Sequence, residues 1–216
     1  MIRIIASHSN RLEYVCRQIF NRWLNIEFEI CQPNDINADA NDTVINYTNS
    51  TVNNAINITP QGLIHQHGIC DVTPEWDGEH LFPTECEFGF DIFSAVFYLI
   101  SRYEEYGENA TDKHGRYMPE NSTLFKQGLL ETPVVDKWVE ELRRTLNDKF
   151  GIEISKHTPE NLTTVDVDNV YAFRNKGIVR HILTSAKDLI KGNKKDVVKR
   201  WKSLLHIEDD PFFIFF

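Results

Sequence analysis

The spacing of apolar and polar residues changes several times along this chain, and each spacing predicts a different element. Residues 2–6 are a short β-branched run, which predicts a buried strand. Residues 26–30 alternate between apolar and charged side chains, which predicts a second strand. Between them, apolar residues return at helical spacing from about Arg11 onward. That face consists of Leu12, Val15, Cys16, Ile19, Phe20 and Trp23. A β-α-β unit is therefore expected at the start.

The middle of the chain predicts three more short strands, at residues 43–47, 55–58 and 62–69. Asp91 can cap a helix that follows it, and this helix is apolar almost all round for three turns, so it should be buried. Pro133 can start another helix with one apolar face, and Gly151 can end it.

The last part predicts two basic amphipathic helices, at residues 178–190 and 197–205. The chain then ends in Phe212, Phe213, Ile214, Phe215 and Phe216. An exposed run of this kind would favour aggregation, so we expect a strand that becomes covered. Burial of this tail in a neighbouring chain would make the protein a homo-oligomer.

Charge is distributed unevenly over the 216 residues. Residues 170–202 hold ten Lys or Arg against two acidic residues, a balance of +8, so the remainder carries −17 of the total of −9. Few aromatic residues accompany the basic helices, which favours a solvated or domain-facing surface over binding to nucleic acid or an anionic membrane surface. No apolar run reaches eighteen residues, so no membrane span is expected. Four cysteines without a C-x-x-C pair indicate free thiols and a cytoplasmic protein.

Residues 164–168 contain the most informative candidate chemistry, because two carboxylates lie two residues apart in a β-branched run. A strand sends Asp166 and Asp168 to the same face, roughly 7 Å apart. Such a pair can bind a metal, or divide the roles of base and ligand. The alternative is a strand end whose acids cap the next helix or pair with Arg174 and Lys176.

Three further sets of residues have a functional and a structural interpretation. His65 and His67 would share one strand face, which suits a metal, or would simply be polar surface. His114 and Arg116 could bind an anionic sugar, or belong to a turn that Asp112 holds to Arg116. The third set, Trp76 and Trp138, could stack on a sugar ring, but packing in the core is the more common role.

Several segments in order resemble a bacterial family of polysaccharide deacetylase-like proteins. They are residues 90–95, 101–106, 112–116, 133–138, 164–169 and 171–173. The resemblance implies two parts: an N-terminal α/β domain of unknown role, then a NodB-like domain of the carbohydrate esterase family 4 type. The second part is a distorted (β/α) barrel that removes N- or O-acetyl groups from carbohydrate substrates with a divalent metal, usually zinc.

By this resemblance Asp166 would be the general base and Asp168 a metal ligand. In the wider superfamily the two acids are adjacent, whereas here Val167 separates them. The sequence contains no H-x-x-x-H pair and no later catalytic histidine of that family. Because metal-assisted deacetylation needs about three protein ligands, a base and an acid, we expect this chain to bind no metal and to lack most of the catalytic domain.

The sequence thus predicts an α/β protein. Residues 1–160 would form a mixed-sheet N-terminal domain, and residues 161–216 the first strand and helices of a truncated NodB-like barrel. The function expected first is the N-terminal portion of a metal-dependent polysaccharide deacetylase, a hydrolase of carbohydrate metabolism that is inactive as this chain. The alternative is a glycan- or partner-binding accessory module without catalysis.

Overall fold

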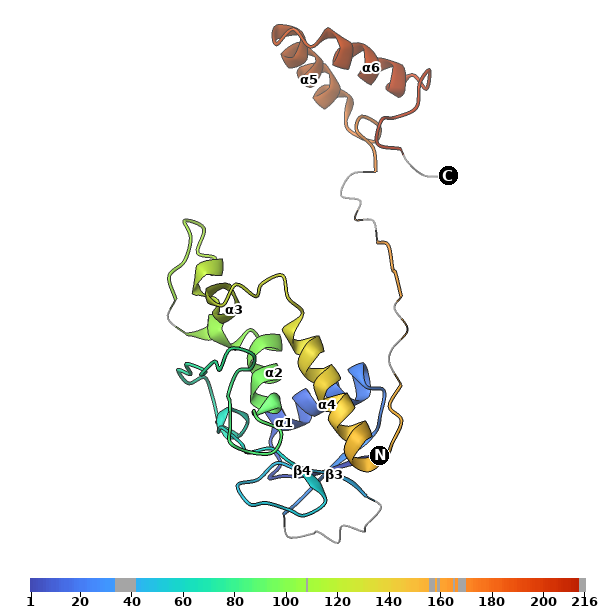
Figure 1. Ribbon diagram of the computed structural model, residues 1–216. Coiled ribbons are helices and arrows are strands. Elements are labelled where there is room, and N and C mark those ends of the chain that lie inside the picture. Colours follow the sequence, from blue (N-terminus) through green and yellow to red (C-terminus); the bar gives the residue numbers. More distant parts are fainter. Residues whose placement is uncertain are drawn as a thin grey trace. The chain divides into compact units, whose positions relative to one another are not determined.

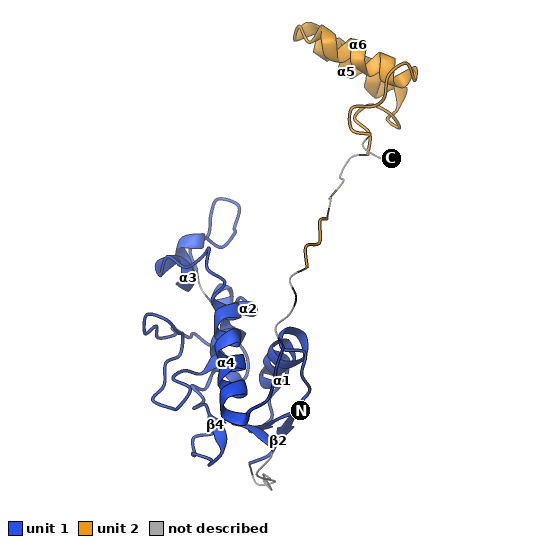
Figure 2. Ribbon diagram, turned by 45° about the vertical axis from the view of Figure 1, so that its right-hand side comes forward, with its two compact units in different colours: residues 1–158 blue, residues 159–216 orange. Residues whose placement is uncertain are grey.

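The computed structural model describes residues 1–33, 42–107, 109–155, 158, 160–164, 166 and 170–213. The chain forms two compact units, unit 1 at Met1–Thr158 and unit 2 at Pro159–Phe216 (Figure 2). No helix among these described residues is long and apolar enough to cross a membrane. All four cysteines carry free thiols, as expected.

Unit 1 is built on a four-stranded sheet in the order β2-β1-β3-β4. The strands are β1 (Ile2–Ile5), β2 (Phe28–Cys31), β3 (Thr43–Asn46) and β4 (Ala55–Asn57). All three pairings are parallel, so the expectation of a mixed sheet is wrong for the described strands. Successive strands run in the same direction because the chain returns to the same edge of the sheet before each new strand begins.

The two faces of the sheet belong to different apolar clusters. Ile2, Ile4, Ile45 and Ile56 pack into the large core, while Ile5, Val44 and Ala55 form a small second cluster. This alternation follows from the period of two along a strand. Helices α1, α2 and α4 lie together on one side of the sheet (Figure 1), so that side holds the large core.

Helix α1 (Asn10–Cys16) continues directly into the π-helix η1 (Arg17–Trp23). Ser9 caps α1, because its hydroxyl accepts the Leu12 N–H at 3.1 Å. Apart from the half-buried Trp23, the predicted apolar face is fully buried. The β-α-β opening is therefore confirmed, with its second strand beginning two residues later than expected.

Two longer helices complete the core of unit 1. They are α2 (Ile92–Ile100) and α4 (Val134–Phe150), and α4 ends at Gly151 with φ at 62°. The shorter elements are the 3-10 helices η2 (Leu63–His65), η3 (Tyr103–Tyr106) and η4 (Pro119–Asn121), and helix α3 (Thr123–Lys126).

The expected strand at residues 62–69 is wrong. Gly62 adopts φ of 94°, and the 3-10 turn η2 follows it. Leu63 and Ile64 are consecutive and both buried, which a half-buried strand with a period of two cannot achieve. The turn-forming glycine at residue 62 decides the conformation.

A single buried carboxylate joins the sheet to the helices. Asp91 is fully buried and accepts four hydrogen bonds, of which two come from Ser94 at the start of α2, N–H at 3.0 Å and O–H at 2.6 Å. The Tyr47 hydroxyl donates to it at 3.0 Å and the Gln61 N–H at 2.8 Å. Burial raises the pKa of Asp91 because it disfavours the charged form, and these donors act in the opposite direction.

We expect Asp91→Ala to lower the free energy of unfolding by about 2–4 kcal/mol, since it removes a helix cap and leaves buried donors without an acceptor. Asp91→Asn should cost less, because it retains one carbonyl acceptor. Asp148→Ala, at an exposed position of α4, is the control and should change stability by less than about 0.5 kcal/mol. Urea denaturation of the three variants is the measurement; equal stability of Asp91→Ala and Asp148→Ala would contradict the account.

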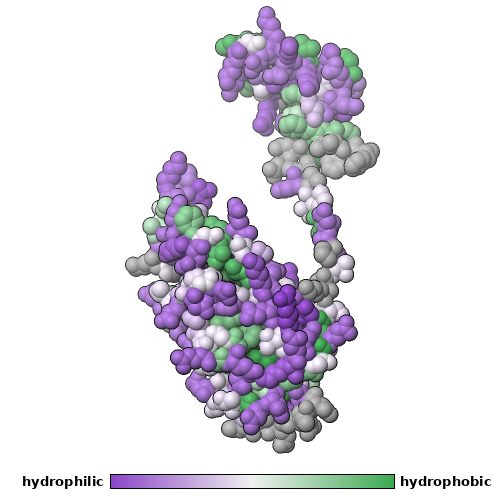
Figure 3. Space-filling view, in the orientation of Figure 1, coloured by the Kyte–Doolittle hydropathy of each residue, from purple (hydrophilic) through white to green (hydrophobic). Residues whose placement is uncertain are grey.

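Unit 2 contains helices α5 (Ile178–Ile190) and α6 (Lys194–Leu204), close to their predicted bounds. Arg200 joins them through Asp188 at 2.6 Å and the Ser185 hydroxyl at 3.1 Å. Asp210 joins the segment after α6 to the segment before α5. Its carboxylate accepts the N–H groups of Ala172 at 2.6 Å and Phe173 at 2.8 Å. Apolar surface interrupts the polar surface of this unit (Figure 3).

The strand expected at residues 164–168 does not form in the part that is described. Residues 160–164 and Asp166 belong to no helix or strand, and Asp168 lies outside the described residues. A strand needs a neighbour to pair its backbone groups, and the described residues of unit 2 provide two helices instead. The expected strand at the tail falls partly on residues 214–216, also outside the described residues, while Phe213 stacks on Tyr171 at 5.7 Å.

Stability of unit 2 should depend on pH through Asp210, which is only 2% exposed. Its backbone donors lower its pKa from 3.8 to about 2, although burial acts the other way. The stabilisation, about 2 kcal/mol, is therefore present above pH 3.8 and lost as pH falls through 2. The protection of the Ala172 and Phe173 amides against hydrogen exchange, relative to the unfolded chain at the same pH, should fall over that range. Asp210→Asn should abolish the dependence and Asp209→Asn should leave it unchanged.

Candidate functional site

A hollow of about 480 Å³ opens where strands β1 and β3 end, and we call it the strand-end hollow. From β1 the chain passes to β2 on one side of the sheet and then to β3 on the other. Ligands of open parallel sheets bind at this kind of reversal, outside the carboxyl ends of the strands. Its lining combines polar, uncharged side chains with apolar ones and glycine. The lining residues are Ile5, Ser7, Pro33, Asn46, Tyr47, Thr48, Asn49, Ser50, Val52, Pro60, Gly62 and His65.

Hydrogen bonds of its own side chains stabilise the loop that forms one wall of the hollow. Asn46, the last residue of β3, donates to the Asn57 side chain at 2.8 Å and to the Ser50 carbonyl. Thr48 donates its hydroxyl hydrogen to the Asn46 side-chain oxygen at 2.8 Å. Asn57 in turn accepts the Val52 N–H at 2.9 Å. Because these bonds fix the backbone around Asn49, the wall is preformed for binding.

Tyr47 and His65 form the aromatic part of the lining. Their ring centres are 5.7 Å apart, and the Tyr47 hydroxyl is engaged with Asp91. Burial raises the pKa of Tyr47 well above its ordinary value, so the phenol stays neutral. Burial also lowers the pKa of His65, against the attraction of Asp91. At neutral pH His65 is therefore an uncharged imidazole that can donate one hydrogen bond and accept another.

The described lining residues therefore carry no formal charge at neutral pH. Amides, hydroxyls and an imidazole offer both donors and acceptors, which suits a ligand that presents hydroxyl groups. An anionic phosphate would find no guanidinium or ammonium group among them.

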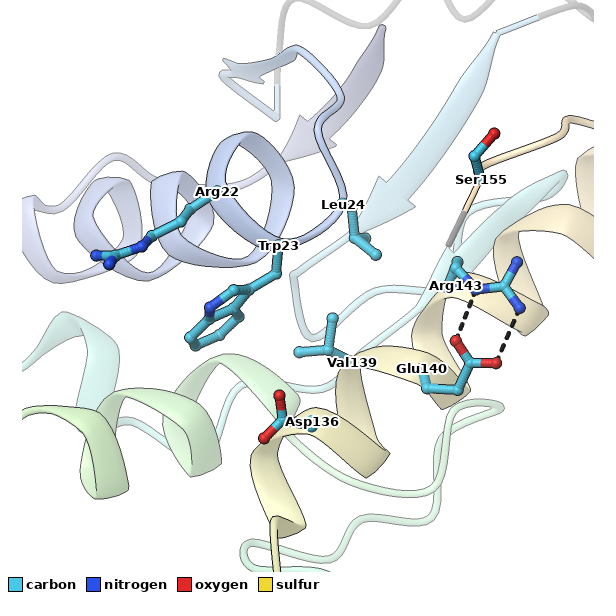
Figure 4. Close-up of a pocket in the computed structure, with 8 residues that line it drawn as sticks. All are labelled: Arg22, Trp23, Leu24, Asp136, Val139, Glu140, Arg143 and Ser155. Carbon is cyan, nitrogen blue, oxygen red and sulfur yellow. Dashed lines mark hydrogen bonds and ion pairs between the residues drawn. The ribbon is translucent and has the colours of Figure 1, made fainter. Parts of the chain in front are cut away.

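A second hollow, of about 420 Å³, lies between η1 and α4 and contains Trp23, Asp136, Glu140 and Arg143 (Figure 4). Arg143 makes two bonds to Glu140, at 2.7 and 2.9 Å, and a third to the Ile154 carbonyl at 2.9 Å. These contacts hold the segment after α4 against the helix. We therefore assign this hollow a structural role.

Of the two residues expected to form a metal site, Asp168 lies outside the described residues, so its pairing with Asp166 stays a prediction. Asp166 is exposed. Among the described residues, no group of three or more His, Cys, Asp or Glu could hold a metal ion, so they do not supply the zinc site implied by the resemblance. That this chain binds no metal stays a prediction.

His114 and Arg116 lie in an exposed turn. Asp112 accepts the His114 N–H at 2.7 Å and the Arg116 Nε–H at 2.9 Å, so the interpretation as a tied turn is confirmed. Their role in substrate binding stays a prediction. Trp138 is buried in the core, and its indole N–H donates to the Glu79 carbonyl at 3.1 Å.

Sequence reasoning missed the strand-end hollow. The polar residues 48–50 directly follow the strand expected at residues 43–47, and no function is expected of them from the sequence. Their position at the carboxyl end of a parallel strand was the signal that could have found the hollow.

The fold and this hollow define an α/β protein whose first unit has a parallel sheet with an uncharged strand-end hollow. Residues 1–151 match the model of a family described as "Family of unknown function (DUF7033)", and the chain belongs to this family. No curated protein and no solved structure gave a match.

His65 should titrate below 6.5, the ordinary value for histidine, because its surroundings disfavour the charged imidazolium. Since the folded pKa is lowered, the contribution of His65 to stability is present above pH 6.5 and decreases as pH falls through the folded pKa. NMR titration of the imidazole ring signals in the full chain is the measurement, with the urea-unfolded chain as reference. A folded midpoint at or above the unfolded one would contradict the assignment.

Proposed function

We propose that this chain is the N-terminal portion of a metal-dependent polysaccharide deacetylase, in which unit 1 recognises the carbohydrate. The chain alone has no deacetylase activity. The observation that carries the recognition role is the preformed, uncharged strand-end hollow at the reversal point of a parallel sheet.

A neutral sugar fits the chemistry of this hollow. Sugar hydroxyls act as donors and acceptors at once, as do Asn49, Ser7 and His65 on the wall. A rigid wall reduces the entropy lost on binding, which matters for a weakly binding polar ligand.

The deacetylase part rests on the resemblance of the segments from residue 90 to residue 173. Asp166 as general base and Asp168 as metal ligand belong to that proposal, together with a NodB-like barrel. The alternative is an accessory module that binds glycan without catalysis, and the same hollow supports it. Free thiols support a cytoplasmic location.

The full chain should bind an oligomer of N-acetylglucosamine at the strand-end hollow. Asn49→Ala should weaken binding about 5–10-fold, as expected for the loss of one hydrogen bond of about 1–1.5 kcal/mol. Asn53→Ala, an exposed asparagine of the same loop outside the hollow, is the matched control and should leave affinity unchanged. NMR titration of backbone amides gives both the affinity and the location.

Acetate release should be measured on the same samples with added Zn²⁺. Binding at the hollow without acetate release is the expected result. Absence of shifts around Asn49 and His65 would reject the recognition role. Acetate release that Asp166→Asn abolishes would reject the statement that the chain alone is inactive.

A further inference from the structure

A third hollow in unit 1, of about 280 Å³, differs in chemistry from the strand-end hollow. Three tyrosines and two carboxylates line it, and we call it the tyrosine pocket. The tyrosines are Tyr98, Tyr103 and Tyr117, and the carboxylates are Asp71 and Glu104. They come from distant segments: the end of α2, η3, the turn before η4, and the loop before Trp76.

Glu104 is held in the lining by a hydrogen bond from the backbone. One of its carboxylate oxygens accepts the Thr123 N–H, the first of α3, at 2.9 Å. Burial raises the pKa of both Tyr98 and Tyr117, and the charge of Glu104 acts in the same direction; all three side chains line the pocket. A carboxylate has about four acceptor positions, so one bond leaves Glu104 able to accept more.

The hydrogen bonding of the Tyr117 side chain points to a ligand. Its hydroxyl is buried and has no hydrogen-bond partner among the described residues. Burial, with Glu104 adding to it, raises its pKa to about 12, so the hydroxyl keeps its proton at neutral pH. Buried hydroxyls are normally satisfied, and one that lines a hollow can be satisfied by a bound molecule.

The charges of the lining favour a cation. Asp71 and Glu104 outweigh Lys126, the cation of the described lining, whose side chain is exposed. Aromatic faces also attract cations, and Tyr103 already contacts one, with the Arg11 guanidinium 5.2 Å from its ring centre. A metal ion is not favoured, because no group of three metal-ligating side chains is present among the described residues.

We propose that the tyrosine pocket binds the ammonium group of a deacetylated amino sugar, with Glu104 and Asp71 facing the positive charge and the Tyr117 hydroxyl bonded to the sugar. This inference rests on the proposed carbohydrate recognition and deepens it. The two hollows would then distinguish the two states of one polymer: the neutral acetylated unit in the strand-end hollow, and the charged unit in the tyrosine pocket.

The probes are the tetramers of glucosamine and of N-acetylglucosamine, each titrated into the full chain at pH 6 and followed by NMR. The glucosamine tetramer should shift the signals of Tyr98, Tyr117 and Thr123. Glu104→Gln should weaken its binding at least 5-fold, and Tyr117→Phe, which keeps the ring, should weaken it less. Glu120→Gln, an exposed acid of η4 outside the lining, is the matched control and should have no effect.

Since Glu104 also supports α3, Asp71→Asn is the second test, because Asp71 is exposed and removal of its charge does not threaten the fold. Equal binding by Asp71→Asn, Glu104→Gln and the unchanged chain would overturn the proposal. So would equal shifts at the tyrosine pocket with the acetylated tetramer. Shifts only at the strand-end hollow would reject the ammonium site and leave the proposed function standing. Shifts only at the tyrosine pocket would support the ammonium site and reject carbohydrate recognition at the strand-end hollow.

Discussion

The rest of unit 1 depends on the buried carboxylate of Asp91. It caps α2, holds the hydroxyl of Tyr47 just after β3, and accepts the N–H of Gln61 before η2. A carboxylate without partners would be strongly unfavourable in this place, so the four donors and the acid require one another. The strand-end hollow depends on these hydrogen bonds. Asp91 holds the segment after β3 and the segment before η2, and these segments place Tyr47 and His65 in the lining.

Unit 2, which is smaller, is also stabilised by a buried carboxylate. Asp210 collects the amides of Ala172 and Phe173, and so closes a pair of helices that shares little apolar core. Small assemblies bury too little surface to be stable by packing alone. In unit 2 the acid substitutes for contacts that a larger core would supply, whereas in unit 1 the acid joins segments around a large core and lies behind the strand-end hollow.

Much of the fold could be predicted from sequence, because local periodicity dominates in the helices and strands. Asp91 before an apolar helix and Gly151 after an amphipathic one are signals that tertiary contacts do not override. The parallel sheet could not be read from its strands, since pairing direction depends on how the connections run. The described residues of the expected strand at 164–168 are not in a strand for a related reason: β-propensity requires a partner, and the described residues of unit 2 offer none.

The candidate sites were harder to predict than the fold because their residues come together only in three dimensions. Tyr117 and Tyr98 are nineteen positions apart in the chain, and neither belongs to a recognisable spacing. The turn at Asp112 was identified, yet its conspicuous cation at Arg116 is neutralised by that same acid. The residue next to it, Tyr117, is the one whose buried hydroxyl lacks a partner. In this chain the noticeable charges of Asp112 and Arg116 stabilise a turn, while inconspicuous phenols and amides line the hollows, so the spacing of charged residues along the sequence does not lead to the hollows.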